Sequence, residues 1–98
     1  MTPRDRPLEF ARPDDARALA EMSRDLIETG LGWEYRAGRI ERMIADPGTT
    51  VLVARDGACV AGFAVMSFGD DRAHLALLAV RPAHRRRGIA RSLLAWLV

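Results

Sequence analysis

The chain has 98 residues, of which 49% are hydrophobic and 29% charged, a composition typical of one soluble globular domain that excludes a disordered chain. No stretch approaches the roughly 20 apolar residues that cross a bilayer, and the segment MTPRDRPLEF lacks the apolar core of a signal peptide, so we expect a cytoplasmic protein without a membrane partner. All 15 basic residues are arginines, which excludes chemistry that needs a lysine, and the formal net charge is +2.

The first half of the chain predicts one strand and two helices. The strand is expected over residues 7–13. Asp14 or Asp15 is expected to cap the helix that follows, because a carboxylate accepts hydrogen bonds from the free N–H groups of a helix start. This helix should end near Gly30, and a second helix is predicted over residues 36–45. The apolar face of the first helix is expected to consist of Ala16, Leu19, Ala20, Ser23, Leu26 and Ile27.

The second half begins with a β-rich region. Three strands are predicted, over residues 49–55, 58–68 and 72–80. Asp56 and Gly57 predict a tight turn between the first two of them. Cys59 is the only cysteine, so no internal disulfide can form. Because it lies in an apolar run, we expect a small buried side chain rather than a nucleophile.

The charge is unevenly distributed along the chain. Residues 1–80 contain ten arginines and thirteen acidic residues, whereas residues 81–98 contain five arginines and no acid. The basic residues concentrate at positions 84–87, between a strand that Pro82 ends and a helix predicted from Ile89 onward. An anionic partner is therefore expected at this one place.

The segment from Arg85 to Ala90 has the parts of a phosphate cradle. Backbone N–H groups at a helix start are unpaired and carry the positive end of the helix dipole, equivalent to about half a charge. Gly88 allows a ligand to approach the main chain closely, and the arginines add charge and hydrogen bonds. With its single glycine, the segment is neither a Walker loop nor a GxGxxG sequence.

The longer segment LLAVRPAHRRRGIARSLLAWL resembles the GNAT superfamily of acyl-CoA-dependent N-acyltransferases. The family pattern is a strand ending in hydrophobic-Ala-Val-x-Pro, then Gln/Arg-x-x-Gly-x-Gly/Ala, then a leucine-rich helix. The resemblance covers residues 7–98 and implies an α/β fold in the order β-α-α-β-β-β-α, with a mixed sheet and an antiparallel meander. A complete member continues with a strand, a helix and two more strands, so we expect an incomplete GNAT domain.

The resemblance also implies acetyl-CoA as the co-substrate. Main-chain amides at the helix start would hold its pyrophosphate, and a bulge in the preceding strand would free backbone groups for the pantetheine arm. The coenzyme-binding residues would be Leu78, Ala79, Val80, Arg85, Arg86, Arg87, Gly88, Ile89, Ala90 and Arg91. No metal site is expected.

Acetyl transfer to a primary amine usually needs a base that takes a proton from that amine. His74 occupies the position at which histone-type members carry a glutamate, and its alternative role is that of a solvent-facing histidine at a strand start. Glu34 is a second candidate base. Trp33 and Tyr35, with Glu34 between them, are expected either to line the acceptor pocket or to form an apolar plug between two helices.

These observations leave two functions open. The leading hypothesis is a GNAT-type N-acetyltransferase that acts on a small-molecule or peptide amine. The alternative is a truncated acyl-CoA-binding or oligomerisation module without turnover. Nucleic acid is not expected as a partner, because the arginines surround one turn and no aromatic stacking platform lies nearby. The apolar end, residues 96–98, predicts a homodimer or other self-association through uncovered surface.

Overall fold

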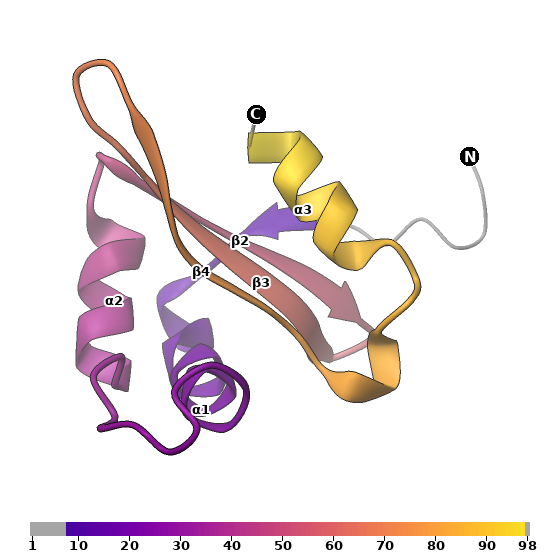
Figure 1. The fold of residues 1–98 in the computed structure, drawn as a ribbon. Coiled ribbons are helices and arrows are strands. Elements are labelled where there is room, and N and C mark those ends of the chain that lie inside the picture. The colour runs from indigo at the N-terminus through magenta and orange to yellow at the C-terminus, as the bar shows by residue number, and fades with distance from the viewer. Residues whose placement is uncertain (1–7, 98) are drawn as a thin grey trace.

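The order of helices and strands is the predicted one in the computed structural model, which describes residues 8–97 (Figure 1). The elements are β1 (Leu8–Phe10), α1 (Ala16–Leu26), α2 (Ala37–Ala45), β2 (Thr49–Asp56), β3 (Cys59–Phe68), β4 (Ala73–Val80) and α3 (Ile89–Leu97). Short 3₁₀ turns, Pro13–Asp15 and Pro82–His84, precede α1 and α3. Pro7 and Val98, which were assigned to the first strand and the apolar end, lie outside the described residues. No helix within residues 8–97 has the length and apolar character needed to span a membrane.

The strands form one sheet in the order β1-β2-β3-β4, and every neighbouring pair in its described part is antiparallel. The sequence predicts a mixed sheet that includes an antiparallel meander. The described residues contain the meander, and all of their strand pairs are antiparallel. Helices α1 and α2 pack on one face and α3 packs on the other (Figure 1). Strand β3 contributes to both cores, with Phe63 and Val65 toward α1 and α2 and Ala64 toward α3. Burial on both faces explains why its sequence is a continuous apolar run.

The turn between β2 and β3 lies one residue later than predicted. Asp56 belongs to β2 and pairs with Cys59, so Gly57 and Ala58 form the turn, and Gly57 adopts a φ of 64°. Cys59 is exposed, so the prediction of a buried cysteine is wrong. It is the first residue of β3, directly beside the turn, and the buried part of the strand begins only at Val60.

Asp15 does not cap α1 in the predicted way. Its side chain makes no cap hydrogen bond to α1 and instead accepts from the Arg12 N–H at 2.7 Å and from two Arg55 nitrogens at 2.7 and 3.0 Å. Arg55 also binds Glu9 at 2.6 Å, so one guanidinium joins β1, the start of α1 and β2. Burial by itself raises the pKa of Asp15, but the bonds from Arg55 and Arg12 outweigh it and leave the pKa below its ordinary value.

Gly62 allows α3 to lie close to the sheet. A Cβ atom on Gly62 would lie 3.0 Å from Cγ2 of Ile89, 3.1 Å from the carbonyl oxygen of Ala79 and 3.2 Å from Cγ2 of Val80. Carbon atoms in contact prefer separations of about 3.5–4.0 Å. The missing side chain at this position therefore sets the distance between β3, β4 and the first turn of α3.

An exposed aromatic pair joins the end of α3 to β1. Trp96 is 49% exposed, and its ring meets the ring of Phe10 edge-on, with 5.2 Å between the ring centroids. The tryptophan is therefore a surface residue that packs against β1. Self-association through this apolar surface stays a prediction.

Candidate functional site

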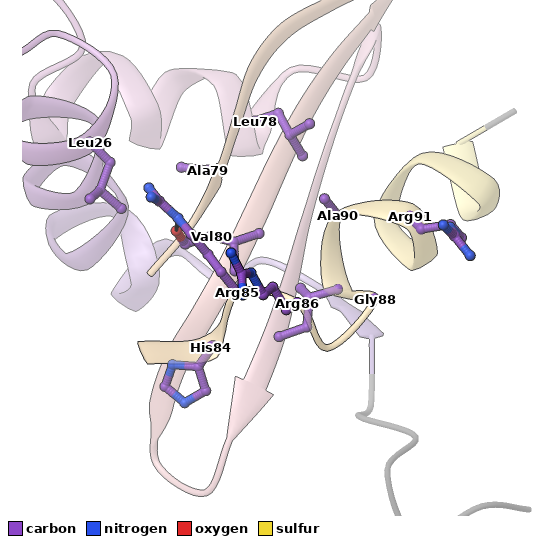
Figure 2. A pocket seen from close by; sticks show the side chains of 11 residues that line it. Leu26, Leu78, Ala79, Val80, His84, Arg85, Arg86, Gly88, Ala90 and Arg91 are labelled. Atoms are coloured by element: carbon purple, nitrogen blue, oxygen red, sulfur yellow. Dashed lines mark hydrogen bonds between the residues drawn. The ribbon is translucent and has the colours of Figure 1, made fainter. Parts of the chain in front are cut away.

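A cavity of about 490 Å³ lies beside β4 and the start of α3, with the end of α1 on its other side (Figure 2). Its volume falls in the range of about 300–1,000 Å³ that is typical of small-molecule sites. The lining residues are Leu26, Leu78, Ala79, Val80, His84, Arg85, Arg86, Gly88, Ile89, Ala90 and Arg91. The structure thus brings together nine of the ten residues predicted to bind the coenzyme, all except Arg87.

Strand β4 carries a bulge directly before the cavity. Its pairing with β3 skips Ala76, because Val65 faces Leu77 and Met66 faces Leu75. A bulge of this kind leaves one residue unpaired and bends the strand. β4 is also the edge strand of the described sheet, so its outer backbone groups face away from β3. The residues predicted to contact a pantetheine arm follow this bulge.

The loop between Arg85 and Gly88 turns sharply before α3. Arg86 has a φ of 66° and Gly88 a φ of 75°, and both values lie in the left-handed region that non-glycine residues rarely adopt. Ser92 N–H donates to the Gly88 carbonyl at 2.9 Å. The amides of residues 89–91 therefore precede the helical ladder, as they do at every helix start. A concave backbone with free amides is suited to binding an anion.

The cavity has a positive lining. Arg85, Arg86 and Arg91 line it, and none of them forms an ion pair with any described residue. The Nε–H of Arg85 donates to the Val80 carbonyl at 3.2 Å. Figure 2 shows Arg85 and Arg86 together beside β4, whereas the side chain of Arg91 points away from them. Since no carboxylate of the described chain lines the cavity, the site is complementary to a compact anion.

The two predicted bases lie outside the cavity lining. His74 is exposed near the start of β4, where it pairs with Ser67 of β3. Leu78 lies four positions later in the sequence, which corresponds to about 13 Å along a strand. The Glu34 side chain is 76% exposed, with its carboxylate 3.7 Å from the guanidinium of Arg39. The structure therefore brings neither group to the basic loop.

Trp33 and Tyr35 are half-buried and pack against the core formed with α1 and α2. The indole N–H of Trp33 donates to a main-chain carbonyl of α1 at 3.2 Å. The guanidinium carbons of Arg24 and Arg36 lie 5.2 and 4.7 Å from the centroid of its ring, and that of Arg39 lies 4.2 Å from the centroid of Tyr35. This packing fits the plug, and a role in acceptor binding stays a prediction.

Sequence reasoning missed Glu28, a buried carboxylate that fixes the loop after α1. It is 7% exposed and accepts hydrogen bonds from the Ser23 hydroxyl at 2.7 Å and from the N–H groups of Glu34 at 2.7 Å and Tyr35 at 3.3 Å. Burial by itself raises the pKa of Glu28, but these bonds and nearby Arg39 hold it below its ordinary value. Ser23 was the available signal, because a serine on a buried helix face needs a hydrogen-bond partner.

Replacing Glu28 with glutamine is expected to lower the free energy of unfolding by about 2 kcal/mol at pH 7, because the NH₂ group that replaces one carboxylate oxygen cannot accept a hydrogen bond. The folded pKa lies below the unfolded value of about 4.3, so this stabilisation is complete above about pH 5 and is lost as the pH falls through the folded pKa. Urea unfolding at pH 7 and at about pH 3 measures both effects. Glu41→Gln, on the exposed side of α2, is the control, and equal stability of Glu28→Gln and the unchanged protein at pH 7 would contradict this role.

One comparison with known proteins identifies a family. The model of the acetyltransferase (GNAT) family matches residues 14–98. Sequence comparison with curated proteins finds no match. Among solved structures, the chain is similar to PaiA N-acetyltransferase from Thermoplasma acidophilum in complex with coenzyme A. The TM-score is 0.81 at 17% identity, and the match covers 95% of this chain and 69% of the other.

Two further structures have the same fold. The ribosomal-protein-S18-alanine N-acetyltransferase from Escherichia coli matches with a TM-score of 0.73 and 21% identity, over 95% of this chain and 57% of its own. AAC(6')-Iy in complex with the bisubstrate analogue CoA-S-monomethyl-acetylneamine matches with a TM-score of 0.75 and 16% identity, over 95% and 69%. At these identities the likeness to solved structures shows the fold, and the family rests on the match to residues 14–98.

Proposed function

This chain belongs to the GNAT acetyltransferase family, and from that premise we propose that it binds acetyl-CoA in the cavity beside β4 and transfers the acetyl group to a primary amine. One observation supports the proposal most strongly, namely that the family motif and the cavity lie at the same place. The family's Arg-x-x-Gly-x-Ala motif, residues 85–90, forms the basic wall of the 490 Å³ cavity in the described structure.

The pyrophosphate of the coenzyme suits the start of α3. A diphosphate carries two negative charges in a compact volume, and the first-turn amides, the helix dipole and the arginine side chains offer matching donors. A Cβ atom on Gly88 would meet no atom within 4 Å, so the space in front of this residue is open to a ligand. The positive charge of the cradle and the open space at Gly88 therefore support the assignment of the diphosphate to this loop.

The acyl arm suits the outer edge of β4. Pantetheine contains two amide groups, which need donors and acceptors along their path, and an edge strand after a bulge offers backbone N–H and C=O groups. Leu78 on β4 and Leu26 on the opposite side of the cavity give apolar surface for the carbon chain. We therefore assign the pantetheine arm to residues 78–80.

The reaction moves one acetyl group and one proton. The uncharged amine nitrogen attacks the thioester carbonyl, the C–S bond breaks, and the thiolate of CoA takes up a proton as it leaves. His74 and Glu34 remain the proposed bases for the amine. Two structural neighbours are a ribosomal-protein-S18-alanine N-acetyltransferase and AAC(6')-Iy in complex with CoA-S-monomethyl-acetylneamine, so the proposal includes both a peptide amine and a small-molecule amine as acceptors.

One observation favours the alternative, an acyl-CoA-binding module without turnover. Neither proposed base lines the cavity, and its described lining contains no carboxylate. A base outside this lining would act on the amine through water molecules or after a movement of the chain. The two functions therefore differ in turnover and share coenzyme binding.

A thiol-release assay separates the two functions. We expect CoA thiol to appear when acetyl-CoA is mixed with either an alanine-terminated peptide or an aminoglycoside, and not when the amine is left out. Coenzyme binding without thiol release for any amine would support the module instead. If His74 is the base, His74→Ala should lower kcat by about 100-fold or more and flatten the pH–rate profile, whereas an unchanged profile would leave His74 a surface residue.

A further inference from the structure

Two residues of the segment after β4, Arg81 and His84, form hydrogen bonds to the β2–β3 hairpin. The main-chain N–H of Arg81 donates to the Ala61 carbonyl at 2.8 Å, and its Nε–H donates to the Val60 carbonyl at 2.8 Å. Three residues later, Nε2 of His84 lies 2.8 Å from Oδ2 of Asp56. A carboxylate can only accept, so Nε2 carries the proton of this bond. The hairpin thus holds the chain just before the basic loop begins.

His84 faces the hairpin rather than the arginines. Its side chain is 16% exposed, and Figure 2 shows the ring directed away from Arg85 and Arg86. Its other ring nitrogen, Nδ1, is buried and has no hydrogen-bond partner within residues 8–97. Within the described structure, the bond to Asp56 is therefore the polar contact that fixes the orientation of the ring.

The loop that follows needs such support. Arg86 adopts a φ of 66°, a left-handed conformation that is unfavourable for a residue with a side chain. A conformation of this kind persists only where its surroundings enforce it. The first turn of α3, packed against Gly62, holds the far end of the loop, and His84 and Arg81 hold the near end.

We propose that Asp56 and His84 form a positioning pair, which keeps the loop 85–88 in the conformation that binds the phosphates of the coenzyme. Asp56 lies outside the cavity lining and acts through the ring of His84, which it holds toward the hairpin at the start of the loop. Asp56 lies 28 residues earlier in the sequence, at the end of β2, so the β2–β3 hairpin becomes part of the coenzyme site. This inference rests on the proposed function, because it concerns affinity for the same coenzyme.

Binding of the phosphate-containing part of the coenzyme and binding of its pantetheine part are measured separately. The comparison distinguishes a positioning role of the pair from a general loss of stability. We expect Asp56→Ala and His84→Ala each to weaken binding of CoA and of 3',5'-ADP about tenfold in calorimetry, since each removes a bond to a charged group. Binding of pantetheine, which lacks the phosphates and the adenosine, should be unchanged in an NMR titration. Asp56→Asn should weaken binding of CoA and 3',5'-ADP less than Asp56→Ala does, because the amide oxygen of asparagine still accepts a hydrogen bond from Nε2 of His84. The double variant should be no weaker than either single one.

The matched control is Asp70→Ala, which removes an exposed carboxylate from the β3–β4 turn and should leave all three affinities unchanged. The inference is overturned if CoA and 3',5'-ADP bind the variants as tightly as the unchanged protein. It is equally overturned if pantetheine binding weakens in step with nucleotide binding, since the pair would then only stabilise the fold. Failure of the unchanged protein to bind CoA would instead overturn the proposed function, and this inference with it.

Discussion

Replacing Gly88 with valine is expected to abolish coenzyme binding, with a loss of affinity for CoA of about 100-fold or more. Two effects act in the same direction. Gly88 has a φ of 75°, which a β-branched residue strongly disfavours, so the backbone of the cradle would change. If the backbone did not change, the valine side chain would occupy open space at Gly88, directly before α3, where the diphosphate is proposed to lie.

Gly30→Val is the matched control for this change. Gly30 also has a positive φ, 79°, and an added Cβ would also meet no atom within 4 Å, but it lies after α1 and away from the cavity lining. The free energy of unfolding should fall by a similar amount in both variants. Only Gly88→Val should lose affinity for CoA in calorimetry. If Gly88→Val were folded and bound CoA as tightly as Gly30→Val, the phosphate assignment would be wrong.

Replacing Gly62 with valine is expected to lower the free energy of unfolding by about 3 kcal/mol and to weaken CoA binding as well. Valine favours strands, but that preference is worth at most about 1 kcal/mol. The clash outweighs it, because Cβ would lie 3.1 Å from the main-chain oxygen of Ala79, which cannot move without moving β4. The nearest neighbour is Cγ2 of Ile89, the first residue of α3, at 3.0 Å, so relief of the clash is expected to displace the cradle.

Urea unfolding and calorimetry with CoA measure the two effects of Gly62→Val. Gly69→Val in the β3–β4 turn is the control, since its nearest neighbour, the Arg72 carbonyl oxygen, would be at an ordinary 3.7 Å from the added Cβ. A Gly62→Val protein of unchanged stability would show that α3 does not depend on this close approach.

Much of the fold could be predicted because its signals are local. The spacing of Ala16, Leu19 and Ala20 predicts a helix with a buried face, and these three residues are buried in α1. The change from helical to strand-like composition at Thr49 marks the first residue of β2. The predicted boundaries deviate at the turns, where one residue more or less in a ladder has little local signal. The turn at Gly57 was therefore placed one residue too early, and the neighbouring Cys59 was wrongly assigned to the interior.

The candidate site also has a part that the sequence predicts and a part that it does not. The coenzyme loop could be predicted because its residues are contiguous and their pattern is specific, and residues 85, 86 and 88–91 line one cavity. Contacts between residues distant in the sequence could not be predicted. No sequence pattern indicates the bond between His84 and Asp56. Glu28 was missed for a related reason, because its partners include two backbone N–H groups, which no sequence motif displays.

The central claim is that main-chain amides at the start of α3 bind the diphosphate of CoA. NMR titration of ¹⁵N-labelled protein with CoA tests it most directly. We predict that the largest amide shifts occur from Arg86 to Arg91, with smaller ones along residues 78–80. Saturating shifts centred on α2 or on the β3–β4 hairpin, or no shifts at millimolar CoA, would contradict it.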